Sequence, residues 1–326
     1  KIQKEQRIPE VSQPKTQHQI QETMSGRGLT SGKRPGRGGG MKKLGFMSFR
    51  STMKEAFTGD DKDGKAAEAT PANAINVINT VKKTFPGALS SSELALRVKS
   101  VLAGKGFEKE KSLLAVSLCC DEVNRDLEDD LRKNYGSNFS MGGLAGFPFG
   151  GVTSFGAMAH HIPEDGSCVV VYGPHVGVDY DGTIGKVNRR GRGGSGACCG
   201  SAAAAAAFVT MVRAGEREAP DASIPDDIID AQQAYVGTAL LPHGERLEKA
   251  FQPEVELPKA LFDCQDGLMI KIVEKGAKEV AGEGLIALVG GIQINTPEKV
   301  SEYFLVKRFE LRNNKGEVVE DLLDKL

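Results

Sequence analysis

Four cysteines and one histidine stand at the ends or starts of apolar segments, where they could bind a metal ion or react as thiols. They are Cys119, Cys120, His175, Cys198 and Cys199. Zinc accepts thiolate sulfur and imidazole nitrogen, and catalytic zinc sites typically combine three protein ligands with a water molecule. Adjacent cysteines are too close to chelate one ion comfortably, and a disulfide between neighbours is strained. The residue types therefore leave open a Cys–His–Cys metal site, redox-active thiols, or buried cysteines that serve only in packing.

The segments that must position these residues predict an α/β fold. The apolar runs 112–118 and 167–172 have the length of strands buried on both faces. Each run ends shortly before one of the candidate ligands, and in α/β folds ligands bind beyond the carboxyl ends of strands. The charged segment 121–136 and the alanine-rich segment 198–215 are predicted helices. A cysteine at a helix N-terminus has its thiolate favoured by the helix dipole.

Other segments complete this picture. A capping box formed by Ser90 and Glu93 starts one predicted helix, and the final strand alternates apolar and polar residues as an outer or interface strand does. The additional helices are expected over 71–85, 90–106 and 226–241, and the additional strands over 282–297 and 302–313.

A segment rich in glycine and phenylalanine, residues 136–161, lies between the two apolar runs. Large apolar side chains are poor residues to leave in water, and glycine lets the backbone approach a ligand closely. The segment therefore predicts the wall of a small apolar pocket rather than a surface loop. The candidate pocket residues are Phe147, Phe149, Phe155 and His161.

Composition separates a basic leader from an acidic body. Residues 1–66 hold 14 Lys and Arg against 7 Asp and Glu, and the remaining 260 residues hold 28 against 36, so the net charges are +7 and −8. The leader is rich in Gly, Arg, Lys and Ser, so we expect residues 1–69 to be largely disordered and residues 70–326 to form one folded domain. No apolar run is long enough to span a membrane. The leader lacks interleaved aromatic residues, which does not favour nucleic-acid binding.

Four motifs occur together in the order CCDEVNR, GGLAGFPFGG…FGAMAHH, YGPHVG and CCGSAA. Together they resemble the limiting-carbon-dioxide-inducible B proteins of algae, which are grouped with the theta-class carbonic anhydrases. The resemblance covers about residues 71–326 and leaves the basic leader out. It implies a fold like that of β-carbonic anhydrases, with a central, mostly parallel sheet flanked by helices. It also implies a zinc site built from a Cys-x-Asp-x-Arg motif and a His-x-x-Cys-Gly motif.

The first of these family motifs matches at Cys119 and Asp121. Its arginine is not at the expected spacing, and the nearest is Arg125, four residues after Asp121. Residues four apart share one face of a helix, so the two side chains are expected to pair. The resemblance then implies that Asp121 orients the zinc-bound water, and that Arg125 holds the carboxylate off the metal.

The second motif is split by a long insertion. His175 matches its histidine, and Cys199 with Gly200 matches its Cys-Gly. The glycine favours Cys199 over Cys198, although the choice between them stays open. The resemblance thus implies zinc held by Cys119, His175 and Cys199.

The implied function is reversible hydration of carbon dioxide to bicarbonate by zinc-bound hydroxide, in an algal carbon-concentrating mechanism. The resemblance adds that His160 or His161 would be a proton shuttle. The resemblance further implies a homodimer or a hetero-oligomer within the family, located in the chloroplast: the stroma, the vicinity of the pyrenoid or the thylakoid lumen. Two alternatives stay open. One is a non-catalytic, zinc-containing member that binds carbon dioxide or bicarbonate, or acts as a scaffold. The other is a thiol-redox or RNA-associated protein.

Overall fold

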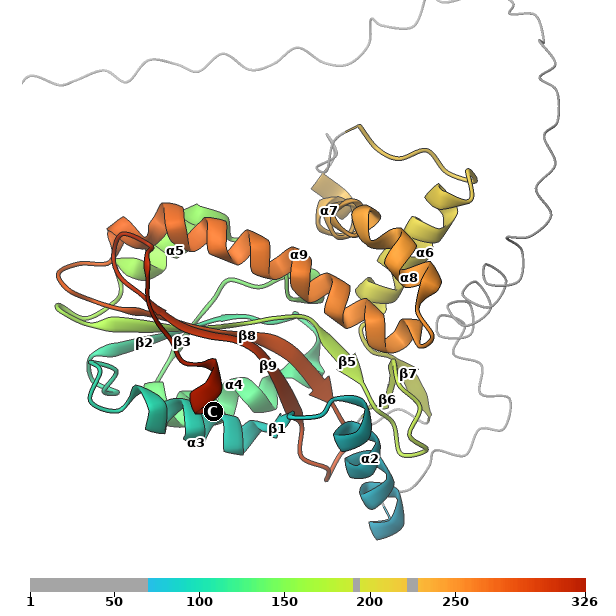
Figure 1. Ribbon diagram of the computed structural model, residues 1–326, viewed down its shortest axis with the longest axis horizontal. Coiled ribbons are helices and arrows are strands. Elements are labelled where there is room, and N and C mark those ends of the chain that lie inside the picture. Colours follow the sequence, from blue (N-terminus) through green and yellow to red (C-terminus); the bar gives the residue numbers. More distant parts are fainter. Residues whose placement is uncertain (1–69, 190–193, 222–227) are drawn as a thin grey trace, which may run out of the picture. The chain divides into compact units, whose positions relative to one another are not determined.

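The computed structural model describes residues 70–189, 194–221 and 228–326. The leader expected over residues 1–69 lies outside these ranges. The described part has the α/β architecture predicted from the sequence, with a mostly parallel central sheet between layers of helices (Figure 1). None of its helices combines the length and the apolar character needed to cross a membrane.

The central sheet has the strand order β1-β9-β8-β4-β2-β3, with β10 paired to β9 and β5 paired to β8. Strands β3, β2, β4 and β8 run parallel, and β9 runs antiparallel to β8. A separate two-stranded hairpin is formed by β6 and β7. The strand bounds are β1 Leu89–Ser90, β2 Ser112–Ser117, β3 Asn138–Ser140, β4 Ser167–Tyr172, β5 His175–Gly177, β6 Lys186–Asn188, β7 Ser195–Ala197, β8 Ile286–Asn295, β9 Tyr303–Arg312 and β10 Val318–Asp321.

Helices cover both faces of this sheet. In Figure 1, α9 and α5 lie across one face and α3 and α4 lie across the other, while α6, α7 and α8 gather beside the N-terminal half of α9. The helix bounds are α2 Pro71–Thr84, α3 Ser91–Leu102, α4 Arg125–Tyr135, α5 Gly151–Ala159, α6 Gly200–Arg213, α7 Ala231–Leu240, α8 Gly244–Lys249 and α9 Pro253–Gly276. Short 3₁₀ turns include η1 Glu122–Asn124 and η2 Leu144–Gly146.

The parallel strands β2 and β4 are largely apolar because both of their faces are buried. Ala115 and Val170 point into the core beneath α5 and α9, whereas Val116 and Val169 point into the core beneath α3 and α4. Successive side chains of a strand point to opposite faces, so a continuous apolar run fills both cores at once. This confirms the interpretation of the runs 112–118 and 167–172.

A third apolar cluster joins α6, α7, α8 and α9 to the glycine- and phenylalanine-rich segment. Ala202, Ala205 and Ala206 of α6 are buried in it, and their small side chains allow the helices to approach closely. Cys119 and Cys199 belong to the same cluster. The candidate ligands therefore lie where the carboxyl edge of the sheet meets this helical group.

Two elements differ from the prediction. The segment 121–136 does not begin as an α-helix, because η1 precedes α4 and the regular helix starts only at Arg125. The long helix α9 was not predicted, and Pro258 lies inside it. As the sixth residue of α9, Pro258 removes one helical hydrogen bond, and the burial of many α9 side chains offsets this loss.

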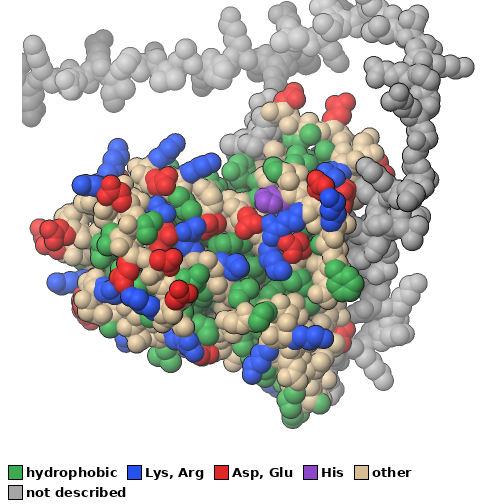
Figure 2. All heavy atoms as spheres, viewed as in Figure 1, with side chains coloured by type: hydrophobic (Ala, Val, Ile, Leu, Met, Phe, Trp, Pro, Cys, Tyr) green, Lys and Arg blue, Asp and Glu red, His purple; other side chains and the backbone are tan. Residues whose placement is uncertain are grey.

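The face in Figure 2 carries intermixed basic and acidic side chains rather than a field of one sign. A nucleic-acid backbone would require a concentrated basic surface. This face of the described domain therefore offers no support for the RNA-associated alternative.

Candidate metal centre

Three segments far apart in the sequence place their side chains together at one edge of the sheet. Cys119 follows β2, His175 opens β5 directly after β4, and Cys199 precedes α6 as its N-cap residue. Because β2 and β4 are parallel neighbours, their carboxyl ends deliver Cys119 and His175 to the same place. Their ligand atoms and that of Cys199 all lie within 4.8 Å of one another.

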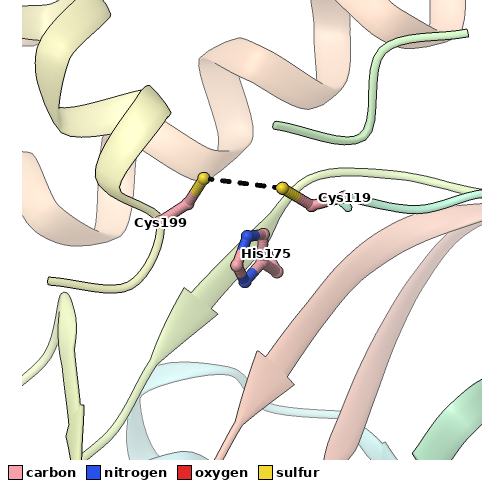
Figure 3. A group of neighbouring side chains, drawn as sticks. All are labelled: Cys119, His175 and Cys199. Atoms are coloured by element: carbon pink, nitrogen blue, oxygen red, sulfur yellow. Dashed lines mark hydrogen bonds between the residues drawn. The ribbon is translucent and has the colours of Figure 1, made fainter. Parts of the chain in front are cut away.

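The two sulfurs face each other, with His175 beside them (Figure 3). The Sγ atoms of Cys119 and Cys199 are 3.9 Å apart, and no disulfide joins them. All three residues are buried, with exposed fractions of 3% for Cys119, 2% for His175 and 6% for Cys199. This arrangement brings together the three ligands expected from the sequence.

One backbone feature makes this approach possible. Gly173 lies between β4 and His175 with φ of +152°, and a Cβ atom there would lie 1.8 Å from the carbonyl oxygen of Gly291. Only glycine tolerates both the backbone conformation and the contact. The turn that carries His175 can therefore pass directly against β8.

The cluster fits a metal ion on two observations. The Nε2 atom of His175 is buried and has no hydrogen-bond partner among the described residues, while Nδ1 lies 2.7 Å from Oδ1 of Asn295. A buried polar atom without a partner is costly, and a metal ion would satisfy it. The donor set of two sulfurs and one imidazole nitrogen also suits zinc.

The pKa shifts of the side chains agree with this fit. The contact with Cys199, together with burial, raises the pKa of the Cys119 thiol to about 12. Burial would lower the pKa of His175, but the neighbouring thiols Cys198 and Cys119 raise it well above its ordinary value. Two buried sulfurs at this distance resist carrying two negative charges unless a cation lies between them.

Asp121 lies at the same place, and its partner is Arg189. One guanidinium group donates to both carboxylate oxygens, at 2.6 Å to Oδ1 and 2.8 Å to Oδ2. Burial would raise the pKa of Asp121, but the hydrogen bonds from Arg189 outweigh it and hold that pKa well below its usual range. An oxygen of Asp121 also lies within 4.8 Å of the ligand atoms of His175 and Cys198. The carboxylate is therefore ionised beside the cluster.

The expected pairing of Arg125 with Asp121 is corrected by the structure. Arg125 donates to the carbonyl oxygen of Cys119 at 2.6 Å and pairs with Glu128 at 2.8 Å. The i,i+4 argument fails because Asp121 is extended and precedes η1, so the two residues do not share one helix. Arg125 supports the ligand loop through its backbone instead.

The arginine that pairs with Asp121 comes from the β6–β7 hairpin, directly after β6. It lies 68 residues further along the chain. The sequence signal was a polar loop with arginines at 189, 190 and 192, just before the second cysteine pair. Sequence spacing alone offered no way to choose among them or to connect them with Asp121.

The two members of the second cysteine pair point to different partners. Cys199 faces Cys119, whereas the Sγ atom of Cys198 lies 3.4 Å from Nδ1 of His175 and 3.5 Å from Oδ1 of Asn295. In the first pair, Cys119 is buried and Cys120 is exposed. The geometry thus leaves one buried ligand candidate in the first pair. In the second pair, Cys199 groups with Cys119 and His175, whereas Cys198 groups with Asp121 and His175.

The predicted pocket residues divide into two groups. Phe147 is buried in the same apolar cluster as Cys119 and Cys199, and the ring of Phe149 lies 5.9 Å from it. Phe155 is instead buried in the core beneath α9, where it packs against Gly276.

The two candidate shuttle histidines are exposed and lie away from the cluster. His161 contacts the ring of Phe139, which is level with Ala115 in the β2–β3 ladder. Ala115 precedes Cys119 by four residues, or about 13 Å of strand. His160 lies near Glu279 on the surface. The structure therefore does not place a histidine shuttle at the candidate centre in either position.

A cavity of about 170 Å³ adjoins the cluster on the Cys198 side. Its apolar walls come from β5, α6 and α9, and none of the four predicted pocket residues lines it. Its lining includes His175, Val176, Ile184, Cys199, Ala202 and Leu257.

The fold and the site together indicate a metal-binding α/β protein. Its candidate centre is a buried Cys–His–Cys group, with an ionised aspartate beside it, at the carboxyl edge of a mostly parallel sheet. Residues 88–313 match the family model described as limiting CO2-inducible proteins B/C beta carbonic anhydrases. The chain belongs to this family.

Solved structures agree with the assignment. The crystal structure of PtLCIB4, a homolog of the limiting CO2-inducible protein LCIB, is 48% identical, with a TM-score of 0.70 over 75% of this chain and 99% of that chain. A mutant of PtLCIB4 is 46% identical, with a TM-score of 0.71 over 76% and 99%. LCIB itself is 21% identical, with a TM-score of 0.56 over 73% and 96%, and supports the fold alone. No curated protein sequence matches the chain.

Proposed function

We propose that this chain is a zinc-dependent carbonic anhydrase that interconverts carbon dioxide and bicarbonate. The observation that carries the proposal is the buried group of Cys119, His175 and Cys199, in which Nε2 of His175 has no hydrogen bond to the part of the chain that the structure describes. Membership of a family described as beta carbonic anhydrases supports the substrate. When bound, zinc lowers the pKa of a water molecule and so supplies a nucleophile at neutral pH.

The side chains around the cluster have separate roles in this proposal. Cys119, His175 and Cys199 hold the metal. Asp121 is ionised and accepts a hydrogen bond from a water molecule at the cluster, which orients that molecule towards the substrate. Arg189 holds both oxygens of Asp121, so that the carboxylate does not become a ligand and close the site.

The cavity beside His175 suits an uncharged substrate. Val176, Ile184, Ala202 and Leu257 contribute apolar walls. Carbon dioxide has no charge and needs a small apolar space next to the nucleophile, and water bound there weakly would be displaced at little cost. We therefore place carbon dioxide in this cavity rather than beside Phe155.

The test combines metal analysis with stopped-flow measurement of carbon dioxide hydration. We expect about one zinc ion per chain and zinc-dependent hydration, both lost in His175→Ala and Cys199→Ala. The matched control is Cys198→Ala, which should retain zinc because its thiol contacts Nδ1 of His175 and Oδ1 of Asn295 rather than the Nε2 side of the ring. Zinc-loaded protein without hydration would indicate the non-catalytic alternative, and metal-free protein with rapid thiol–disulfide exchange would indicate the thiol-redox alternative. Either result would contradict the proposal.

We extend the proposal to a homodimer in the chloroplast that serves a carbon-concentrating mechanism. The support is the family resemblance and the limiting-CO2 description of the relatives. Light scattering on the purified protein would measure the dimer, and a fluorescent fusion of the full-length protein would report the compartment. A monomer, or fluorescence in the cytosol, would contradict the corresponding part.

A further inference from the structure

A buried group of polar side chains lies on the Nδ1 side of His175. It consists of Asn295 at the end of β8, Gln293 two residues before it, and Glu302 directly before β9. Asn295 and Gln293 are fully buried and Glu302 is 7% exposed. The mechanism proposed above uses none of them. Burying a polar side chain lowers the stability of the fold unless hydrogen bonds of good geometry replace those it made to water. The presence of three such side chains beside His175 therefore suggests that they have a role.

The hydrogen bonds of Asn295 determine which way its amide faces. Its Nδ2 donates to the carbonyl oxygen of Val123 at 2.9 Å and to Oε1 of Glu302 at 2.9 Å. A backbone carbonyl can only accept, so the amide nitrogen must point to this side. The amide oxygen then faces His175, where Nδ1 is 2.7 Å away.

The orientation of Asn295 in turn determines the tautomer of His175. An amide oxygen can only accept, so Nδ1 of His175 must carry the proton. In the neutral ring that a metal ion requires, the lone pair is then on Nε2, which makes no hydrogen bond to any described residue. Metal ligation requires this lone pair, and the group that holds the other ring nitrogen commonly sets it.

The same amide oxygen also engages Cys198. The thiol of Cys198 donates to Oδ1 of Asn295 at 3.5 Å. Cys198 is thereby occupied on the Nδ1 side of the imidazole, while Cys199 faces Cys119. One acceptor atom thus accounts for both the ring tautomer and the choice between adjacent cysteines.

We propose that Glu302, acting through Asn295, is a positioning residue that presents Nε2 of His175 to the metal and keeps Cys198 off it. The inference rests on the proposed zinc site but not on turnover. It connects the ligand on β5 to β9, and through Val123 to η1, which follows Asp121.

The surroundings of Glu302 support a dedicated role. Its other oxygen accepts from Nε2 of Gln293 at 2.8 Å. Within the described ranges, no Lys or Arg forms an ion pair with it. Burial raises the pKa of Glu302 to about 7, against the lowering effect of the hydrogen bonds from Asn295 and Gln293. A buried carboxyl group without a basic partner lowers the stability of the fold. An apolar side chain would fill the same space without this cost, so the carboxyl group at position 302 points to a role beyond packing.

The experiment compares Glu302→Leu, which removes the acceptor, with Glu302→Gln, which keeps an amide oxygen for Asn295. Zinc affinity is measured by competition with a chromophoric chelator, and ¹⁵N NMR of labelled histidine in the zinc-loaded protein identifies which nitrogen of His175 binds the metal. We expect Glu302→Gln to resemble wild type. We expect Glu302→Leu to bind zinc roughly 10- to 100-fold more weakly, with a mixture of ring states.

The matched control is Glu310→Gln, which changes the other buried carboxylate of β9, bonded to Arg308 and Arg312. It should leave zinc affinity and the histidine spectrum unchanged. If Glu302→Leu does not fold, Asn295→Leu removes the acceptor directly and should give the same spectral change.

The inference is overturned if Glu302→Leu, or Asn295→Leu in its place, keeps wild-type zinc affinity and a single Nε2-bound state. It is also overturned if Glu310→Gln weakens zinc binding equally. The outcome is separate from that of the proposed function, because zinc-loaded protein without carbon dioxide hydration would still give both readouts. If wild type bound no zinc, NMR of the metal-free protein at a pH above the titration of His175 would still show which nitrogen of the neutral ring carries the proton.

Discussion

At the scale of single residues, the candidate centre depends on which arginine pairs with the carboxylate of Asp121. Arg189 holds Asp121 with two hydrogen bonds, and both side chains are largely buried. A bidentate arginine–carboxylate pair has a fixed geometry that lysine cannot reproduce. Arg125, which the sequence placed nearer, binds only the backbone of the ligand loop. Control of the carboxylate therefore belongs to a residue remote in sequence.

Replacing Arg189 by alanine should reduce carbon dioxide hydration at least about 100-fold while zinc remains bound. The freed carboxylate of Asp121 can then occupy the metal position intended for water. Stopped-flow rates per bound zinc provide the measurement. Arg125→Ala should stay closer to wild type in rate and lower the free energy of unfolding by about 1–3 kcal/mol. Equal rates for Arg189→Ala and wild type would exclude this role of the guanidinium group.

The raised pKa of Glu302 predicts how stability changes with pH. The unfolded chain releases this proton near the model value of 4.5, whereas the folded chain holds it until about pH 7. The folded state therefore binds more protons between these values, and the contribution is present below 4.5 and lost as pH rises to 7. The loss amounts to about 3 kcal/mol.

Chemical denaturation of the metal-free protein at pH 5 and 7.5 would measure this loss. Glu302→Gln cannot titrate at this position and should lose less stability than wild type between the two pH values. The exposed control Glu283→Gln should follow wild type. Parallel curves for Glu302→Gln and wild type would show that Glu302 is not the group responsible.

At the scale of elements, the β6–β7 hairpin is the feature that completes the centre. Asp179 is buried and fastens it: one carboxylate oxygen accepts from the backbone N–H groups of Tyr180 and Asn188, and the other accepts from the hydroxyl of Ser195. Arg189 follows Asn188 directly. The position of the guanidinium group thus depends on a turn that Asp179 holds closed.

Asp179→Ala should therefore lower catalysis more than it lowers zinc content. Without the carboxylate, the backbone N–H groups lose their acceptor, and Arg189 loses its fixed approach to Asp121. Hydrogen exchange of the hairpin amides should accelerate, and the hydration rate should fall. Asp181→Ala is the control, because Asp181 is exposed and binds only Thr183 nearby. Unchanged exchange at Asn188 in Asp179→Ala would contradict this account.

At the scale of the whole molecule, the candidate centre joins parts that the chain supplies separately. Cys119 follows the sheet strand β2, His175 follows β4, and Cys199 begins a helix of the α6–α8 group. A metal ion that binds only the folded arrangement adds its binding free energy to the stability of the fold. Metal loss should therefore loosen the contact between the sheet edge and the helical group.

Removal of zinc with a chelator should lower the thermal midpoint of unfolding, and added zinc should restore it. At free zinc 1,000-fold above the dissociation constant, the expected stabilisation is about 4 kcal/mol. Differential scanning calorimetry measures the shift, and His175→Ala should show no response to zinc. A wild-type midpoint that does not depend on zinc would mean that the three side chains do not form a metal site.

Local patterns in the sequence were sufficient for most of the fold. The apolar runs that became β2 and β4 are buried on both faces, and Ser90 caps α3 as the capping box predicted. These features depend on neighbouring residues and on simple periodicity. Helix α9 was missed because a proline and polar residues in its first turns weaken the periodic signal, and burial against the sheet stabilises it.

The types of the ligand residues, and their places at strand ends and a helix start, were also determined by the sequence. Their gathering into one group depends on the parallel pairing of β2 with β4 and on the packing of α6 against α9. Only the tertiary structure decided that Arg189 rather than Arg125 holds Asp121, and that Phe155 and His161 lie elsewhere. The physical reason is that hydrogen bonds and ion pairs act over a few ångströms in space, whatever number of residues separates the partners along the chain.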